Sequence, residues 1–144
     1  MTPRKIIEII SCILIVLFLY AALTKSMDYQ KFVVQMSQSP MISDFASSFA
    51  WAVPSVEIII SCLLAIEKFR LYGLFGSLSL MTMFTAYIIL ASRFSDYVPC
   101  SCGGIIQNLT WTQHLIFNGG FIALCIAGLL VEIASKEKRQ IFAD

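Results

Sequence analysis

Residues 71–91 read LYGLFGSLSLMTMFTAYIILA and contain no charged side chain. At about 1.5 Å per residue, a helix of this length spans a hydrocarbon core of about 30 Å. Small residues at Gly73, Gly76 and Ser77 permit close contact with a neighbouring helix. The stretch therefore predicts a membrane-spanning helix that packs against other helices.

The rest of the chain repeats this pattern. Comparable apolar stretches occupy residues 6–23, 45–66 and 115–131. The 144 residues are 58% hydrophobic and 13% charged, with a mean hydropathy of +0.82, whereas a soluble domain is about 25% charged. Because backbone polar groups must be satisfied inside lipid, we predict a single all-α domain, an integral-membrane bundle of four transmembrane helices. The net charge of +1 without a basic patch argues against a nucleic-acid partner, and we see no metal-ligand cluster.

The lysines and arginines predict how this bundle is oriented. Of the ten, only Lys25, Lys31 and Arg93 fall on the side of residues 92–110, and seven fall on the other side. The positive-inside rule then places both termini in the cytoplasm and residues 92–110 outside, as in a multi-pass protein of the bacterial inner membrane with its cysteine loop in the periplasm. The first apolar stretch could also be a signal peptide, but it lacks a clear small-x-small cleavage site, so we interpret it as a helix.

A further helix is predicted between the first two spans, where apolar residues follow the helical spacing i, i+3, i+4, i+7 at Tyr29, Phe32, Val33 and Met36. We expect it to lie in the outer membrane interface, with an irregular loop as the alternative. We expect Ser43 or Asp44 to cap the second span, and Thr110 with Gln113 to form a capping box before the fourth. Three glycines of the fourth span should form a helix contact surface: Gly119, Gly120 and Gly128.

One acidic residue, Glu57, lies deep in a predicted span, between Val56 and Ile58. An ionisable group at that depth costs about 2 to 3 kcal/mol, so it should face the bundle interior and have a partner. Lys25 is the expected counter-charge because both residues fall in the outer half. Two interpretations remain open, a structural ion pair or buried acid and a proton relay.

The predicted outer loop contains the sequence PCSCGG at residues 99–104. A disulfide between Cys100 and Cys102 would close a small, strained and exposed ring, which favours a labile or catalytic bridge over a structural one. The alternatives are two independent thiols or a local clamp on the loop. His114, the only histidine, could activate a cysteine, accept a proton or bond a quinone carbonyl, although an interfacial histidine often does none of these.

Several of these features together resemble those of MauE-type proteins, named for methylamine utilisation, within the wider DoxX-like group of four-helix membrane proteins. The matching positions are YAALTK at residues 20–25, then Asp28 and Phe32, Pro54 and Glu57, and CSCG at residues 100–103. In that family an aromatic residue often follows the second cysteine, whereas Gly103 and Gly104 stand here.

The resemblance implies a membrane redox or maturation factor. MauE-type proteins are linked to maturation of a disulfide-rich periplasmic enzyme subunit, and DoxX-like relatives to quinone-linked oxidation of sulfur compounds. Cys100 and Cys102 would then catalyse thiol–disulfide exchange, supported by His114, Glu57, Lys25 and Arg93. No cofactor is certain, and a quinone is the candidate. The expected partners are membrane lipid and a periplasmic thioredoxin-like or client protein. The alternative is a non-enzymatic scaffold or accessory subunit of a larger membrane complex.

Overall fold

The computed structural model describes residues 2–38, 43–94 and 110–141, so Cys100 and Cys102 lie outside the described residues. Every regular element in these ranges is helical, and four of the helices are long and apolar enough to cross a membrane. This confirms the predicted all-α membrane bundle. In chain order the elements are α1 (Pro3–Met27), α2 (Tyr29–Ser37), a 3₁₀ turn η1 (Ser43–Phe45), α3 (Ala46–Ala65), α4 (Arg70–Phe94) and α5 (Trp111–Ile141).

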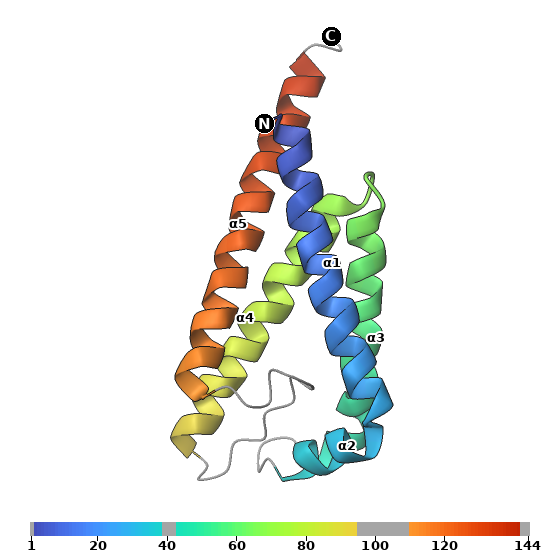
Figure 1. Cartoon of the computed structure of the whole chain (residues 1–144), viewed down its shortest axis with the longest axis vertical. Coiled ribbons are helices and arrows are strands. Elements are labelled where there is room, and N and C mark those ends of the chain that lie inside the picture. The colour runs from blue at the N-terminus through green and yellow to red at the C-terminus, as the bar shows by residue number, and fades with distance from the viewer. Residues whose placement is uncertain (1, 39–42, 95–109, 142–144) are drawn as a thin grey trace.

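The four long helices form a ring in which α1 and α4 each pack against both α3 and α5 (Figure 1). Both chain termini lie at one end of the bundle, which we call the terminal end. We call the opposite end the α2 end. There α1 ends and α2 follows it, and there α4 ends and α5 begins. Toward the α2 end, α1 and α3 diverge from α4 and α5 (Figure 1).

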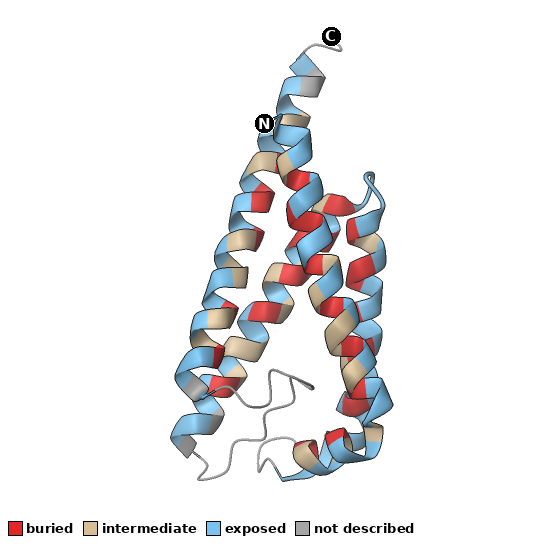
Figure 2. Ribbon diagram, in the orientation of Figure 1, coloured by how far each residue is buried: buried red, intermediate tan, exposed pale blue. Residues whose placement is uncertain are grey.

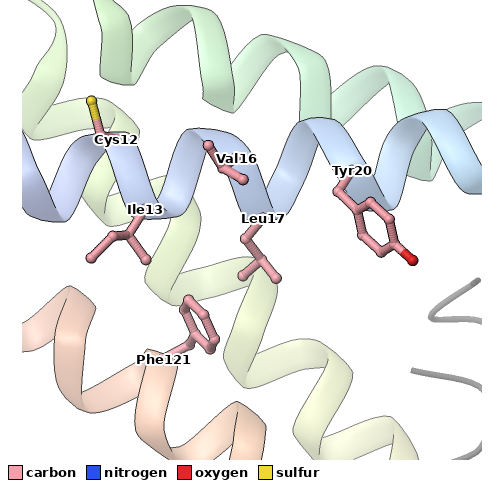
Figure 3. Close-up of a pocket in the computed structure, with 6 residues that line it drawn as sticks. All are labelled: Cys12, Ile13, Val16, Leu17, Tyr20 and Phe121. Carbon is pink, nitrogen blue, oxygen red and sulfur yellow. The ribbon is translucent and has the colours of Figure 1, made fainter. Parts of the chain in front are cut away.

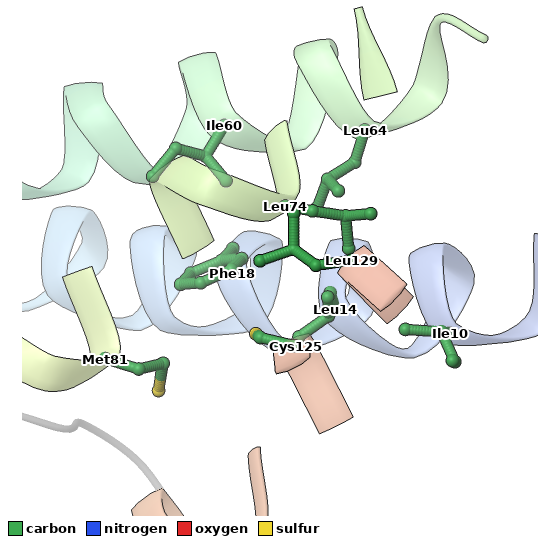
Figure 4. Close-up of a cluster of buried hydrophobic side chains, with 9 residues drawn as sticks. All are labelled: Ile10, Leu14, Phe18, Ile60, Leu64, Leu74, Met81, Cys125 and Leu129. Atoms are coloured by element: carbon green, nitrogen blue, oxygen red, sulfur yellow. The ribbon is translucent and has the colours of Figure 1, made fainter. Parts of the chain in front are cut away.

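The core lies between the four long helices, and buried positions line their facing sides (Figure 2). Its centre is fully enclosed and is formed by Leu14, Phe18, Leu64, Leu74 and Cys125 (Figure 4). The outward faces are apolar as well. Such faces match a lipid environment, in which apolar side chains gain nothing by turning inward.

Glycine brings the helices together in the half of the bundle near the terminal end. A Cβ atom added to Gly73 would lie 2.8 Å from the backbone nitrogen of Leu64, and one added to Gly128 would lie 3.1 Å from Leu74 Cδ2. The predicted contact role is therefore confirmed at these two positions. It is wrong at Gly119 and Gly120, where an added Cβ would meet no described atom within 4 Å. These two glycines lie in the first third of α5, and α1 and α3 diverge from the beginning of that helix (Figure 1).

The predicted helix between the first two spans is present as α2. Its apolar face is turned toward α3, because Phe32 and Met36 are buried against Ala46 and Ala50 of that helix. The face that the sequence pattern assigned to the membrane interface is therefore largely used for contact within the protein. As a result α2 is fixed against the start of α3.

The start of α3 differs from the prediction. Its N-cap residue is Phe45, with no capping bond from a side chain. Ser43 and Asp44 instead lie in the preceding turn η1, with the Ser43 hydroxyl 3.5 Å from the Asp44 carboxylate. The 3₁₀ turn moves both residues ahead of the position from which a side chain reaches the first helical amides, so the predicted cap is wrong.

Candidate functional site

Lys25 and Glu57 form an ion pair inside the bundle, in the half near the α2 end. Lys25 lies in the last turn of α1 and Glu57 in the middle of α3, and the Lys25 ammonium donates a hydrogen bond to Glu57 Oε1. Lys25 is 4% exposed and Glu57 is 2% exposed. The expected pairing is thus present, and it joins two helices that are antiparallel neighbours.

Aromatic rings surround the ammonium end of this pair. Lys25 Nζ lies 5.1 Å from the centre of the Phe84 ring on α4 and 5.9 Å from that of Phe32 on α2. Both distances are within the range of a cation–π interaction. Four helices therefore meet at one charge, because α1 supplies the lysine, α3 the carboxylate, and α2 and α4 the rings.

The carboxylate has remaining hydrogen-bonding capacity. Glu57 Oε2 is buried and accepts no hydrogen bond from the described residues. One turn before it, Pro54 cannot donate a helix hydrogen bond to the Ala50 carbonyl. One turn after it, the Ser61 hydroxyl donates to the backbone oxygen of Glu57 at 2.9 Å. Buried oxygens are normally paired, so the free oxygen is available to a proton, a water molecule or a ligand.

The first turns of α5 place two further polar side chains at the α2 end. His114 is 1% exposed and Asn118, one turn later, is also buried. The predicted capping box is present, since the Thr110 amide donates to Gln113 Oε1 at 2.8 Å and the Gln113 amide to the Thr110 hydroxyl at 3.4 Å. Arg93 lies exposed in the last turn of α4. Cys100 and Cys102 belong to the connection that these two helix ends define.

Two of the hollows along the described helices have almost wholly apolar walls. One of about 260 Å³ lies between α2, α3 and α4, and Phe84, the ring next to Lys25, is part of its wall. The other, of about 440 Å³, is a shallower groove between α1 and α5, where Leu17 and Phe121 point toward one another (Figure 3). Within the described ranges no group of three or more histidine, cysteine or acidic side chains could hold a metal ion.

A second acidic side chain is buried on α5. Glu132 of α5 is 1% exposed, and Lys136 one turn later approaches its Oε1 at 3.7 Å while remaining partly exposed. Arg70, the first residue of α4, is also buried near the terminal end of the bundle. The helical spacing of the sequence indicates this burial, because Glu132 lies on the same face of α5 as the buried residues Cys125 and Leu129.

Comparison with known proteins agrees with this architecture. The family model described as "Methylamine utilisation protein MauE" matches residues 3–131, which include α1 to α4, the connection with Cys100 and Cys102, and most of α5. No curated protein and no solved structure matches the chain significantly. The match supports a membrane protein in methylamine utilisation, and it covers most of the sequence. The chain therefore belongs to the MauE family.

Proposed function

We propose that this protein is a thiol–disulfide exchange factor of the bacterial inner membrane, with Cys100 and Cys102 as its reactive pair and a quinone as its electron acceptor. The observation that carries the proposal is where the Cys-Ser-Cys sequence stands in the fold. It belongs to the connection that leaves α4 and enters α5 at the α2 end, the end where the Lys25–Glu57 pair and His114 are buried.

The exchange reaction is balanced in two steps. A client thiolate attacks one sulfur of the Cys100–Cys102 disulfide, which breaks that bond and forms a mixed disulfide. A second client thiolate then attacks the mixed disulfide, so that the client leaves oxidised and both protein cysteines are reduced. Two electrons and two protons then pass from the dithiol to a quinone, which becomes a quinol, and the Cys100–Cys102 disulfide is restored.

Charge supports the sidedness that this reaction needs. Of the ten lysines and arginines, Arg4 and Lys5 begin α1, Lys68 and Arg70 lie at the turn into α4, and three more lie near the end of α5, so seven share the terminal end. By the positive-inside rule the terminal end is cytoplasmic and the α2 end faces the periplasm, where disulfides persist. A membrane-impermeant maleimide should label the reduced pair in intact spheroplasts. Labelling only after permeabilisation would contradict this orientation.

Single cysteine variants test the exchange reaction. Cys100→Ser and Cys102→Ser should both insert and fold, both should lose client oxidation, and one should accumulate a mixed disulfide that a reductant releases. Cys12→Ser is the matched control, because Cys12 is an exposed free thiol of α1. If both loop variants instead lose assembly with a larger complex and trap nothing, the protein is a scaffold whose cysteines brace a docking loop.

A further inference from the structure

The hollow between α2, α3 and α4 is open toward the membrane. Phe49 of α3 and Met83 of α4 are part of its wall, and they are 42% and 67% exposed on the outward faces of their helices. These faces meet lipid in a four-helix membrane bundle. A ligand would therefore enter sideways from the bilayer and must be soluble in lipid.

The volume of the hollow fits a single ring system. The hollow holds about 260 Å³, a little below the roughly 300–1,000 Å³ of pockets that enclose a whole drug-sized ligand. The Phe49, Phe84 and Tyr87 rings contribute flat apolar surface, and Met36 of α2 contributes a polarizable side chain. Such a wall suits a planar ring whose apolar tail remains in the surrounding lipid.

Polar groups near this wall distinguish a ring bearing oxygen from a plain acyl chain. The Tyr87 hydroxyl is buried and has no hydrogen-bond partner among the described residues. Behind Phe84 lies Lys25 Nζ, 5.1 Å from the ring centre, bonded to Glu57, whose second oxygen is also unsatisfied. The wall of the hollow is itself almost wholly apolar, so the Tyr87 side chain would rotate to donate this hydroxyl to the carbonyl oxygen of a bound ring. An acyl chain would leave the hydroxyl unpaired.

We propose that this hollow binds the ring of a membrane quinone, with Val53, Phe84 and Tyr87 against the ring and the Tyr87 hydroxyl donating to one carbonyl. The site rests on the proposed function in one respect, because thiol–disulfide exchange requires a two-electron acceptor. The Phe84 ring lies between the hollow and the Lys25–Glu57 pair. The pair therefore acts as a positioning and proton-holding group behind Phe84 and does not touch the quinone.

Binding of decylubiquinone to the detergent-solubilised protein, followed by calorimetry, tests the site. Val53→Phe fills the hollow and should weaken binding by about tenfold or more, whereas Val53→Ala should change it by less than about twofold. Tyr87→Phe removes one hydrogen bond and should weaken binding by about fivefold. Val16→Phe in the α1–α5 groove is the matched control and should bind normally.

Two results would overturn the site. One is unchanged binding in Val53→Phe. The other is oleic acid that displaces decylubiquinone equally well from the unsubstituted protein and from Tyr87→Phe, which would make the hollow an acyl-chain site.

A variant with both Cys100→Ser and Cys102→Ser separates this inference from the proposed function. It should bind decylubiquinone with unchanged affinity, because the ring site does not include the cysteines. If binding follows the predicted order but client oxidation is independent of the cysteines, the site stands and the exchange function fails. If client oxidation needs the cysteines but Val53→Phe alters neither binding nor oxidation, the function stands and the site fails.

Discussion

The helices pack differently in the two halves of this bundle. Near the terminal end, Gly73 and Gly128 bring backbones into contact, and Arg4 pairs with Glu8 at 3.2 Å and with Glu67 at 3.4 Å on the exposed surface. Near the α2 end the helices diverge (Figure 1). There the Lys25–Glu57 ion pair is enclosed between helices. The difference teaches that close backbone packing and the fully enclosed Lys25–Glu57 pair occupy separate halves of the molecule.

The energetic consequences of the ion pairs differ in the same way. Exposed pairs such as Arg4 with Glu8 contribute about 0 to 1 kcal/mol. An enclosed pair loses several kcal/mol of hydration for each ion, and its mutual attraction does little more than offset that loss. Stability alone therefore does not explain the Lys25–Glu57 pair, which supports the proton-holding role proposed for it above.

Breaking the enclosed pair should give the largest effect. Glu57→Leu leaves the Lys25 ammonium buried without its counter-charge and should lower the free energy of unfolding by about 3 to 5 kcal/mol. Lys25→Met combined with Glu57→Leu removes both charges and should recover most of that loss. Unfolding by sodium dodecyl sulfate in mixed micelles, followed by circular dichroism, measures both variants.

The double variant also separates structure from function. It should fold and yet lose client oxidation, because the proton-holding group is gone. If it is as unstable as Glu57→Leu, or if it oxidises the client at the normal rate, the pair is a structural link between α1 and α3.

Crowding the close-packed half should give the next largest effect. A methyl group on Gly73 would meet the backbone nitrogen of Leu64 at 2.8 Å, and backbone cannot move aside. Gly73→Ala should therefore cost about 1 to 3 kcal/mol, seen as a lower melting temperature. Gly76→Ala is the milder control, since its nearest atom is a side-chain carbon of Ile60 at 3.2 Å. Equal melting temperatures for the two variants would show that the helices are free to separate there.

The second buried acid provides a matched substitution. Lys136, which approaches Glu132 at 3.7 Å, is itself partly exposed, so Glu132→Gln should change the free energy of unfolding by less than about 1 kcal/mol. Glu57→Gln should cost about 3 kcal/mol or more, because a fully buried ammonium remains. The same micelle titration compares them. Equal losses would mean that burial of the carboxylate, and not burial of its partner, determines the effect.

The smallest effect is expected in the open half. An added Cβ at Gly119 meets no described atom within 4 Å, so Gly119→Ala should gain about 0.5 to 1 kcal/mol from the higher helix propensity of alanine. A slightly raised melting temperature with unchanged client oxidation is the predicted result. Destabilisation would show that another helix does approach this part of α5.

Much of the fold was predictable, because lipid makes hydropathy and length decisive. The uncharged residues 71–91 predict a span on composition alone, and the helical spacing around Phe32 predicts α2. The extent of α5 was not predictable from hydropathy, since its end as far as Ile141 is polar and consists of good helix formers. The contact role of glycines failed at Gly119 because residue size does not reveal where helices diverge.

The candidate site was predictable only in part. Glu57 is an acidic residue among isoleucines, and Lys25 is a basic residue predicted to lie in the same half of the membrane. Their pairing follows from the cost of burying an unpaired charge there. The rings of Phe32 and Phe84 and the adjacent hollow depend on how four helices meet, which no local pattern encodes. The burial of Glu132 is not evident from the sequence, because a lysine one turn away is typical of an exposed helical pair.

The reduction potential of the Cys100–Cys102 pair tests the central claim most directly. The purified protein is equilibrated in glutathione redox buffers, quenched with acid and labelled with a heavy maleimide after denaturation, and Cys12, Cys62 and Cys125 add a constant background. We predict a reversible transition of two thiols at a potential well above the level of about −300 mV that is typical of structural disulfides. A pair that resists reduction like a structural bridge, or that remains reduced under oxidising periplasmic conditions, would contradict the exchange mechanism.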